Sequence, residues 1–264
     1  MNRYPTVELA SARGGKLIGT ALDNELSLHG GGTILGGGGN DRLYIVDSSP
    51  SHVDGGDGND RLWVGFNAGP HAGVKFFGGS GHDTLHGGLG NDLLDGGRDA
   101  DTIMGSDGVD EVTYASRTGA LRVSLDDAPN DGAVTGETDN VWHDVERVRG
   151  GAGNDFLSGN HLNNLLHGGA GNDTLHGIGG NDALFGNGGN DRVFGGGGND
   201  YLEGNVGNDS LYGEAGTDFY LGHDGDDWIY ARDGIGETLN GGPGFDRAQR
   251  DASDNVISIE AFLA

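Results

Sequence analysis

The sequence predicts an all-β protein: a parallel β-roll in which two facing sheets are built from coils of eighteen residues. Three observations lead to this fold class: a nine-residue period, a very high glycine content and a regular acidic position. Glycine supplies 57 of 264 residues, against a usual share near 7%. The net charge of −26 and the hydrophobic content of 34% would by themselves indicate disorder. The nine-residue period outweighs that indication, because a fixed repeat period is typical of folded repeat proteins and is not needed in a disordered chain.

The period follows the template G-G-x-G-N-D-x-(apolar)-x. Nine such segments fill residues 150–230 without a gap, four fill 78–113, and single copies occupy 36–44, 55–63 and 241–249. Fifteen of these segments carry Asp at position six. Weaker copies at 19–27 and 159–167 keep the apolar position eight and carry Asn at position six.

Each nonapeptide is expected to form one turn and one short strand. Positions six to nine alternate as in a strand, with six and eight on one side. Positions one to five are mostly Gly and Asn, which tolerate positive φ and therefore suit a turn. Two units make one coil, and unit n lies over unit n+2. The position-eight residues of the long array then fill the core: Leu157, Leu166, Leu175, Leu184, Val193, Leu202, Leu211, Tyr220 and Ile229.

The acidic position predicts a bound dication. One core side chain in nine residues cannot offset the entropy of ordering the coil, and stacked Asp side chains repel one another. A divalent cation between the acids reverses the sign of that interaction. Carboxylate and backbone oxygens are hard ligands, which favour calcium over zinc or copper, while magnesium prefers to keep its water.

The template resembles the nonapeptide G-G-x-G-x-D-x-U-x of the RTX family, the haemolysin-type calcium-binding repeats. The units that begin at Gly36, Gly55, Gly78, Gly87, Gly168 and Gly195 match it almost letter for letter. The resemblance implies a right-handed parallel β-roll with multiple Ca²⁺ ions in its turns. Each ion would be held by the position-six Asp of units n and n+2 together with turn carbonyls.

The resemblance therefore implies a set of metal ligands. In the long array they are Asp155, Asp173, Asp182, Asp191, Asp200, Asp209, Asp218 and Asp227, in the short array Asp83, Asp92, Asp101 and Asp110, and in the isolated units Asp41, Asp60 and Asp246. Asn164 interrupts one row, so a site that it shares with Asp182 should be weak or missing. Asp99 stands where the template has its third glycine, and either distorts the turn or adds a ligand.

The repeats divide the chain into five segments. We expect an N-terminal cap over 1–18, a first roll over 19–113, a non-repeat insert or cap over 114–149, a second roll over 150–249 and a C-terminal cap over 250–264. The segments DNVWHDVERV (139–148) and DNVISIE (254–260) resemble each other and are expected to cover open roll ends. One continuous roll with a bulged insert is the alternative.

The resemblance also implies export. RTX proteins typically leave Gram-negative cells through a type I secretion apparatus that reads an uncleaved C-terminal signal. The N-terminus has no apolar h-region, so no cleaved signal is apparent, and the last segment is compatible with such a C-terminal signal. We therefore expect a secreted, extracellular calcium-binding protein that folds on reaching calcium. The alternative is an accessory or targeting module of an extracellular enzyme, such as a protease, lipase or polysaccharide-modifying enzyme, or of an adhesin or toxin.

No catalytic signature is present, so we expect no enzymatic activity. The sequence lacks H-E-x-x-H and G-x-S-x-G, and the absence of cysteine excludes thiolate chemistry. The acidic balance disfavours nucleic-acid binding, and no apolar run could cross a membrane. A protein or carbohydrate partner stays unidentified. Phe194, Tyr212 and Tyr230 occupy successive position nines on one side and could contact one, although aromatic residues also simply suit strands.

Overall fold

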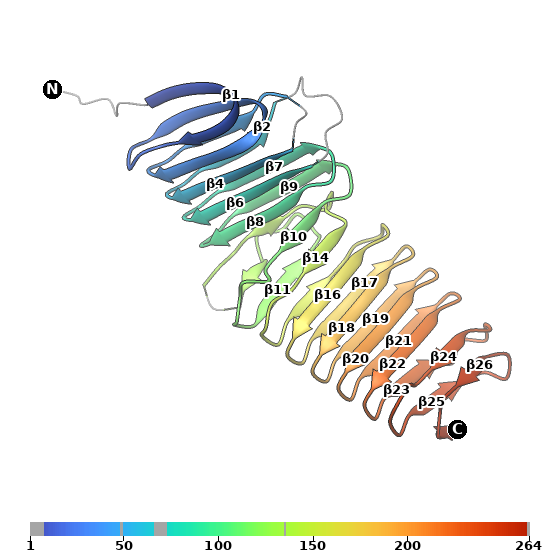
Figure 1. Cartoon of the computed structure of the whole chain (residues 1–264). Coiled ribbons are helices and arrows are strands. Elements are labelled where there is room, and N and C mark those ends of the chain that lie inside the picture. Colours follow the sequence, from blue (N-terminus) through green and yellow to red (C-terminus); the bar gives the residue numbers. More distant parts are fainter. Residues whose placement is uncertain (1–7, 48–49, 66–72, 135, 263–264) are drawn as a thin grey trace. The chain divides into compact units, whose positions relative to one another are not determined.

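The computed structural model describes residues 8–47, 50–65, 73–134 and 136–262. Within them the chain is all β, with parallel strands stacked as a β-solenoid (Figure 1). Part of the N-terminal segment predicted as a cap, residues 1–7, and the last two residues, 263–264, lie outside the described residues. The chain forms two compact units, residues 1–113 with 126–145 and residues 114–125 with 146–264.

The first unit contains two stacks of parallel strands that share β2 (Asn24–Gly38). One stack runs through β3 (Arg42–Ile45), β5 (Arg61–Val64), β7 (Thr84–Leu89), β9 (Thr102–Asp107) and β13 (Asn140–Val141). The other runs through β4 (Ser51–Asp57), β6 (Val74–Ser80), β8 (Leu93–Arg98) and β10 (Glu111–Thr113). β1 (Glu8–Ile18) pairs with β2, and β12 is Gly132–Ala133.

The second unit is built from two parallel sheets. The first sheet runs through β11 (Leu121–Ser124), β15 (Phe156–Ser158), β17 (Thr174–Gly179), β19 (Arg192–Gly197), β21 (Ser210–Ala215), β23 (Trp228–Ala231), β25 (Arg247–Arg250) and β27 (Ala261–Phe262). The facing sheet runs through β14 (Arg147–Arg149), β16 (Leu165–Ala170), β18 (Ala183–Gly188), β20 (Tyr201–Val206), β22 (Phe219–Asp224), β24 (Thr238–Asn240) and β26 (Asn255–Ile257).

The pairing confirms the predicted coil of two nonapeptides. Thr174 pairs with Arg192 and Ala183 with Tyr201, so strand n lies beside strand n+2. Position eight is buried throughout, with Leu175, Leu184 and Leu202 at 0% exposure. Because positions six and eight share one face, this register also places every position-six Asp inside the roll.

Most strands of the repeat units are longer than the three or four residues predicted. A typical one, β17, begins at position seven and continues through position three of the next unit, which leaves a turn of about three residues. Position two makes this possible, because it adopts a left-handed φ even where it is not glycine, as at Ile178 (81°), Asn187 (75°) and Glu214 (72°). The left-handed residue bends the strand while pairing with the neighbouring coils continues.

Candidate metal centre

The position-six Asp side chains form buried rows at the strand starts. In the first unit one row contains Asp41, Asp60, Asp83 and Asp101, and another contains Asp92 and Asp110. In the second unit one row contains Asp155, Asp173, Asp191, Asp209, Asp227 and Asp246, and the facing row contains Asp182, Asp200 and Asp218. All fifteen predicted ligands therefore lie in rows, each with at most 3% of its surface exposed.

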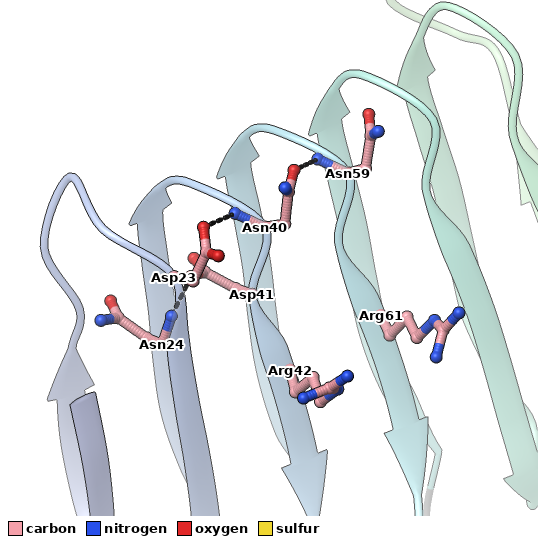
Figure 2. A pocket seen from close by; sticks show the side chains of 7 residues that line it. All are labelled: Asp23, Asn24, Asn40, Asp41, Arg42, Asn59 and Arg61. Carbon is pink, nitrogen blue, oxygen red and sulfur yellow. Dashed lines mark hydrogen bonds between the residues drawn. The ribbon is translucent and has the colours of Figure 1, made fainter. Parts of the chain in front are cut away.

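One carboxylate oxygen of each Asp holds the row together. The backbone N–H of Asp173 donates to Oδ1 of Asp191 at 2.7 Å, and the N–H of Asp191 donates to Oδ1 of Asp209 at 2.7 Å. The same bond links Asp41 to Asp60 in the first unit. A second ladder of exposed Asn side chains lies beside it and runs in the opposite direction, since the N–H of Asn59 donates to Oδ1 of Asn40 (Figure 2). Together, these two ladders of hydrogen bonds fix the position and orientation of each Asp carboxylate relative to the turn of the next coil.

The second carboxylate oxygen, Oδ2, is buried and accepts no hydrogen bond at most row positions in the described part of the chain. This holds for Asp41, Asp60, Asp83, Asp101, Asp173, Asp182, Asp191, Asp200, Asp209, Asp218, Asp227 and Asp246. A buried anionic oxygen without a donor is costly unless a cation approaches it. The rows therefore present a series of oxygen atoms that require positive charge.

Backbone carbonyls converge on the same places. A Cβ atom built on Gly177, a position-one glycine, would collide with both Oδ2 of Asp182 and the carbonyl oxygen of Gly195 in the next coil. Gly36 and Gly222 stand in the same relation to Asp41 and Asp227. Because position one is glycine, a carboxylate oxygen and a carbonyl oxygen can both lie close to its Cα atom. This cradle consists of hard oxygen donors, the ligand type of calcium.

The row carboxylates have raised pKa values. Burial, the largest cause, raises the pKa of Asp83, Asp173, Asp182, Asp191 and Asp227 to about 7. Charge repulsion from neighbouring Asp side chains adds to the effect, and the backbone N–H bonds partly offset it. A dication would restore the ionised form of these groups.

Side chains alone do not complete a metal site. Over the described residues, no group of three or more His, Asp or Glu side chains is arranged to hold a metal ion. A donor set in these rows would need backbone carbonyls beside the row carboxylates. Such a set fits calcium, which accepts six to eight oxygen ligands in flexible geometry.

The first coils of the second unit depart from this pattern. Oδ2 of Asp155 accepts the backbone N–H of Gly151 at 2.8 Å, and Oδ1 of Asn164 accepts the N–H of Asn160 at 2.8 Å. These two turns direct a position-two N–H at the side chain, which satisfies the oxygen without a cation. The weak or missing site expected at Asn164 stays a prediction, and the same turn geometry occurs at Asp155.

Asp99 keeps its turn intact. It adopts a left-handed φ of 78°, as the glycine of the template would. Its Oδ2 accepts the backbone N–H of Gly81 at 3.1 Å, so in this structure Asp99 supports the neighbouring turn.

Sequence reasoning missed five acidic residues at position six: Asp139, Glu146, Glu237, Asp254 and Glu260. The N–H of Asp101 donates to Oδ1 of Asp139 at 2.9 Å, and the N–H of Asp246 donates to Oε2 of Glu260 at 2.8 Å. Glu237 and Asp254 extend the facing row of the second unit, where the N–H of Glu237 donates to Oδ1 of Asp254 at 3.2 Å. The similarity between 139–148 and 254–260 carried this signal: in both segments the Asp and the Glu stand immediately before or at the start of a coil strand.

Glu237 sits in an environment unlike the rest of the rows. Its Oε1 accepts the Tyr220 hydroxyl at 3.2 Å, and its Oε2 is buried and accepts no hydrogen bond. Burial and the adjacent Asp218 charge raise the pKa of Glu237 to about 9.

The predicted aromatic stripe is a stacked column. Phe194 and Tyr212 have ring centroids 4.6 Å apart, and Tyr212 and Tyr230 have centroids 4.2 Å apart, with interplanar angles of 10° and 4°. His176 extends the column at 4.5 Å from Phe194. Because the rings cover one another's faces, the column offers edges rather than the open face on which a sugar ring stacks.

The comparisons with known proteins agree with the geometry. The family pattern described as RTX calcium-binding nonapeptide repeat (4 copies) matches residues 29–44, 50–68, 77–112, 144–175, 162–193, 194–229 and 212–248. No curated protein matches the chain. In the described residues there is no helix of the length and apolarity needed to cross a membrane. The family pattern covers more than half of the chain and falls on the coils that carry the buried carboxylate rows, so this protein belongs to the RTX calcium-binding repeat family.

Proposed function

We propose that this protein is a secreted, non-catalytic calcium-binding protein whose coils become stable when Ca²⁺ enters the carboxylate rows outside the cell. The observation that carries the proposal is the series of buried Oδ2 atoms without a hydrogen-bond donor. Family membership supports calcium as the ion, and RTX proteins are typically extracellular.

Two features of the coils, the N–H ladder and the position-one glycines, would shape the calcium site. The N–H ladder orients each carboxylate so that one oxygen faces the cradle, and glycine at position one keeps that space free of side chains. Bound calcium would supply the counter-charge for two stacked carboxylates. The gain in binding energy is then also folding energy, because the unfolded chain has no preformed site.

The difference in free calcium concentration between the inside and the outside of the cell explains when folding would occur. Extracellular modules bind calcium at about 10⁻⁴–10⁻³ M, far above the free calcium level inside cells. The chain would therefore stay unfolded during export and fold on arrival. Type I export is the route that fits an unfolded chain of this family.

Far-UV circular dichroism tests calcium-dependent folding. The chelated protein should show a disordered spectrum, and millimolar calcium should produce a strand spectrum that magnesium does not reproduce. A strand spectrum that persists at alkaline pH after complete calcium removal would contradict the proposal. Export is tested separately by expression beside a type I apparatus, with mass spectrometry of the secreted chain. Retention of the chain in the cells would contradict that part alone.

A further inference from the structure

Two tyrosines lie in direct ring contact on the outer face of the second unit. Tyr212 is on β21 and Tyr230 is on β23, and the parallel register places these two residues opposite each other. Their ring centroids are 4.2 Å apart, and the two ring planes differ by 4°. The contact is therefore a close and nearly parallel stack of two phenol rings.

The repeat itself produces this stack. Both tyrosines are position-nine residues, and paired parallel strands hold residues of the same position about 4.8 Å apart with their side chains on the same face. Because the rings are nearly parallel, the ring carbons of Tyr212 lie against those of Tyr230. Both side chains are half-buried, so each ring keeps an accessible part at the surface.

The neighbours of the pair carry no phenol. Tyr212 stacks on Phe194 on its other side, and Tyr230 pairs with Gln249 in the next coil. Trp228 is the other readily oxidised side chain nearby, and its ring centroid is 6.2 Å from that of Tyr230. The contact between Tyr212 and Tyr230 is therefore the shorter route for coupling between two oxidised rings.

The other tyrosines have different surroundings. Tyr44 stacks on the indole of Trp63, and Tyr201 stacks on Phe219 in the facing sheet. Tyr114 and Tyr220 are buried, with 2% and 0% of their surfaces exposed. Close ring contact with a second tyrosine and partial exposure thus occur together at Tyr212 and Tyr230.

We propose that Tyr212 and Tyr230 form an oxidative modification site, at which a haem peroxidase supplied with hydrogen peroxide joins the two rings as dityrosine. Each phenol loses one electron and its hydroxyl proton, and the two phenoxyl radicals form a carbon–carbon bond between their ortho positions. The two ortho hydrogens move to the oxygens as the rings regain aromaticity. Hydrogen peroxide accepts the two electrons and two protons and becomes two water molecules.

The new bond would connect two successive coils of one sheet. It would close the chain between β21 and β23 into a covalent loop, and such a loop reduces the conformational freedom of the unfolded state. The linked protein should therefore resist unfolding better than the unmodified one. The cross-link depends on the strand register and on no calcium ligand, so it is separate from the proposed calcium-dependent folding.

Peroxidase treatment of dilute wild-type protein in calcium, followed by isolation of the monomer, tests the site. The monomer should lose the mass of two hydrogen atoms and gain dityrosine fluorescence. After denaturation, an Asp-specific protease cuts between the two tyrosines, at Asp218 and Asp224, and the resulting peptides should stay joined through Tyr212 and Tyr230. A folded monomer without dityrosine, or a cross-link between any other two residues, would overturn the proposal.

Two phenylalanine variants make the test specific. Tyr212→Phe keeps a stacked ring but has no phenol to couple, so it should lose the dityrosine fluorescence. The matched control is Tyr201→Phe, which removes a phenol from the facing sheet and should cross-link to the wild-type yield. Dityrosine at the wild-type yield in Tyr212→Phe, or its loss in a folded Tyr201→Phe, would overturn the assignment.

Urea denaturation in calcium tests the effect of the bond. The cross-linked wild-type monomer should unfold at a higher urea concentration than the peroxidase-treated Tyr212→Phe monomer, relative to the same two proteins before treatment. This comparison removes the effect of any other oxidation, because both proteins receive the same peroxide. An equal change in the two midpoints would overturn the stabilising role of the cross-link.

Discussion

At the scale of single residues, position six and position one act as a pair. Position six provides the oxygen, and position one provides the space beside it, since a Cβ at Gly177 would meet Asp182 Oδ2 and a neighbouring carbonyl. The nonapeptide template predicted the Asp positions directly. It did not predict Asp139 or Glu237, because their turns differ in length and in glycine content from the template, so that only the three-dimensional pairing places them in a row.

A glycine substitution tests this pairing. Gly177→Ala should destabilise the calcium-loaded protein by about 1–3 kcal/mol, as expected when a methyl group is forced into a packed site. Gly179→Ala is the control, because its added Cβ would lie 3.4 Å from His161 Nδ1 and Gly179 has no left-handed φ. Urea denaturation in calcium measures both. Equal midpoints for the two variants would mean that the position-one space is not restrictive.

A carboxylate substitution tests the ligand role of a row Asp. Asp191→Asn should lower the calcium count by one or two ions, since Asp191 is bonded to Asp173 on one side and Asp209 on the other. Asp224→Asn removes the same charge from an exposed position-three side chain and should leave the count unchanged. Isothermal titration calorimetry measures the number of calcium ions bound by each variant. The same loss in both variants would indicate a general charge effect.

At the scale of the element, side chains on both faces of a strand make stabilising contacts. The inner face holds position eight in the core, and the outer face of β17, β19, β21 and β23 holds the stacked rings. The alternation was predictable from the sequence because positions six to nine follow a strand period. The length of the strands was not, because residues such as Ile178 and Glu214 give no local sign that they adopt a left-handed φ.

The aromatic column is expected to stabilise its strands. Tyr212 stacks on Phe194 and on Tyr230, and each aromatic pair contributes about 0.5–1.5 kcal/mol. Tyr212→Ala should therefore lower stability by about 1–3 kcal/mol without changing the calcium count. Ser210→Ala, on the same outer face of β21, serves as the control. A Tyr212→Ala protein with wild-type thermal stability would contradict the prediction.

At the scale of the whole molecule, the rows make acidity and calcium alternative sources of stability. The net charge is −26, and much of the acid is concentrated in buried rows. In the metal-free fold, burial raises the pKa of Asp101 to about 8 and that of Asp191 to about 7, from 3.8. The folded state thus binds more protons than the unfolded state across this range.

The sign of the resulting pH dependence follows from linkage. Without calcium, the proton-linked stability is fully present below about pH 4, the ordinary pKa of Asp. It is lost as the pH rises to about 8, the pKa of Asp101. The chelated protein should therefore gain strand structure on acidification from neutral to mildly acidic pH. Calcium should act most strongly at alkaline pH, where it does not compete with protons for the carboxylates.

Circular dichroism of chelator-stripped protein over this pH range, with and without calcium, measures both effects. High salt at alkaline pH is the necessary control, because acid also reduces the repulsion between exposed carboxylates, and salt screens that repulsion without protonating the rows. If salt alone restored the strand spectrum, surface repulsion rather than the buried rows would govern folding. A metal-free spectrum that does not change with pH would contradict the raised pKa values themselves.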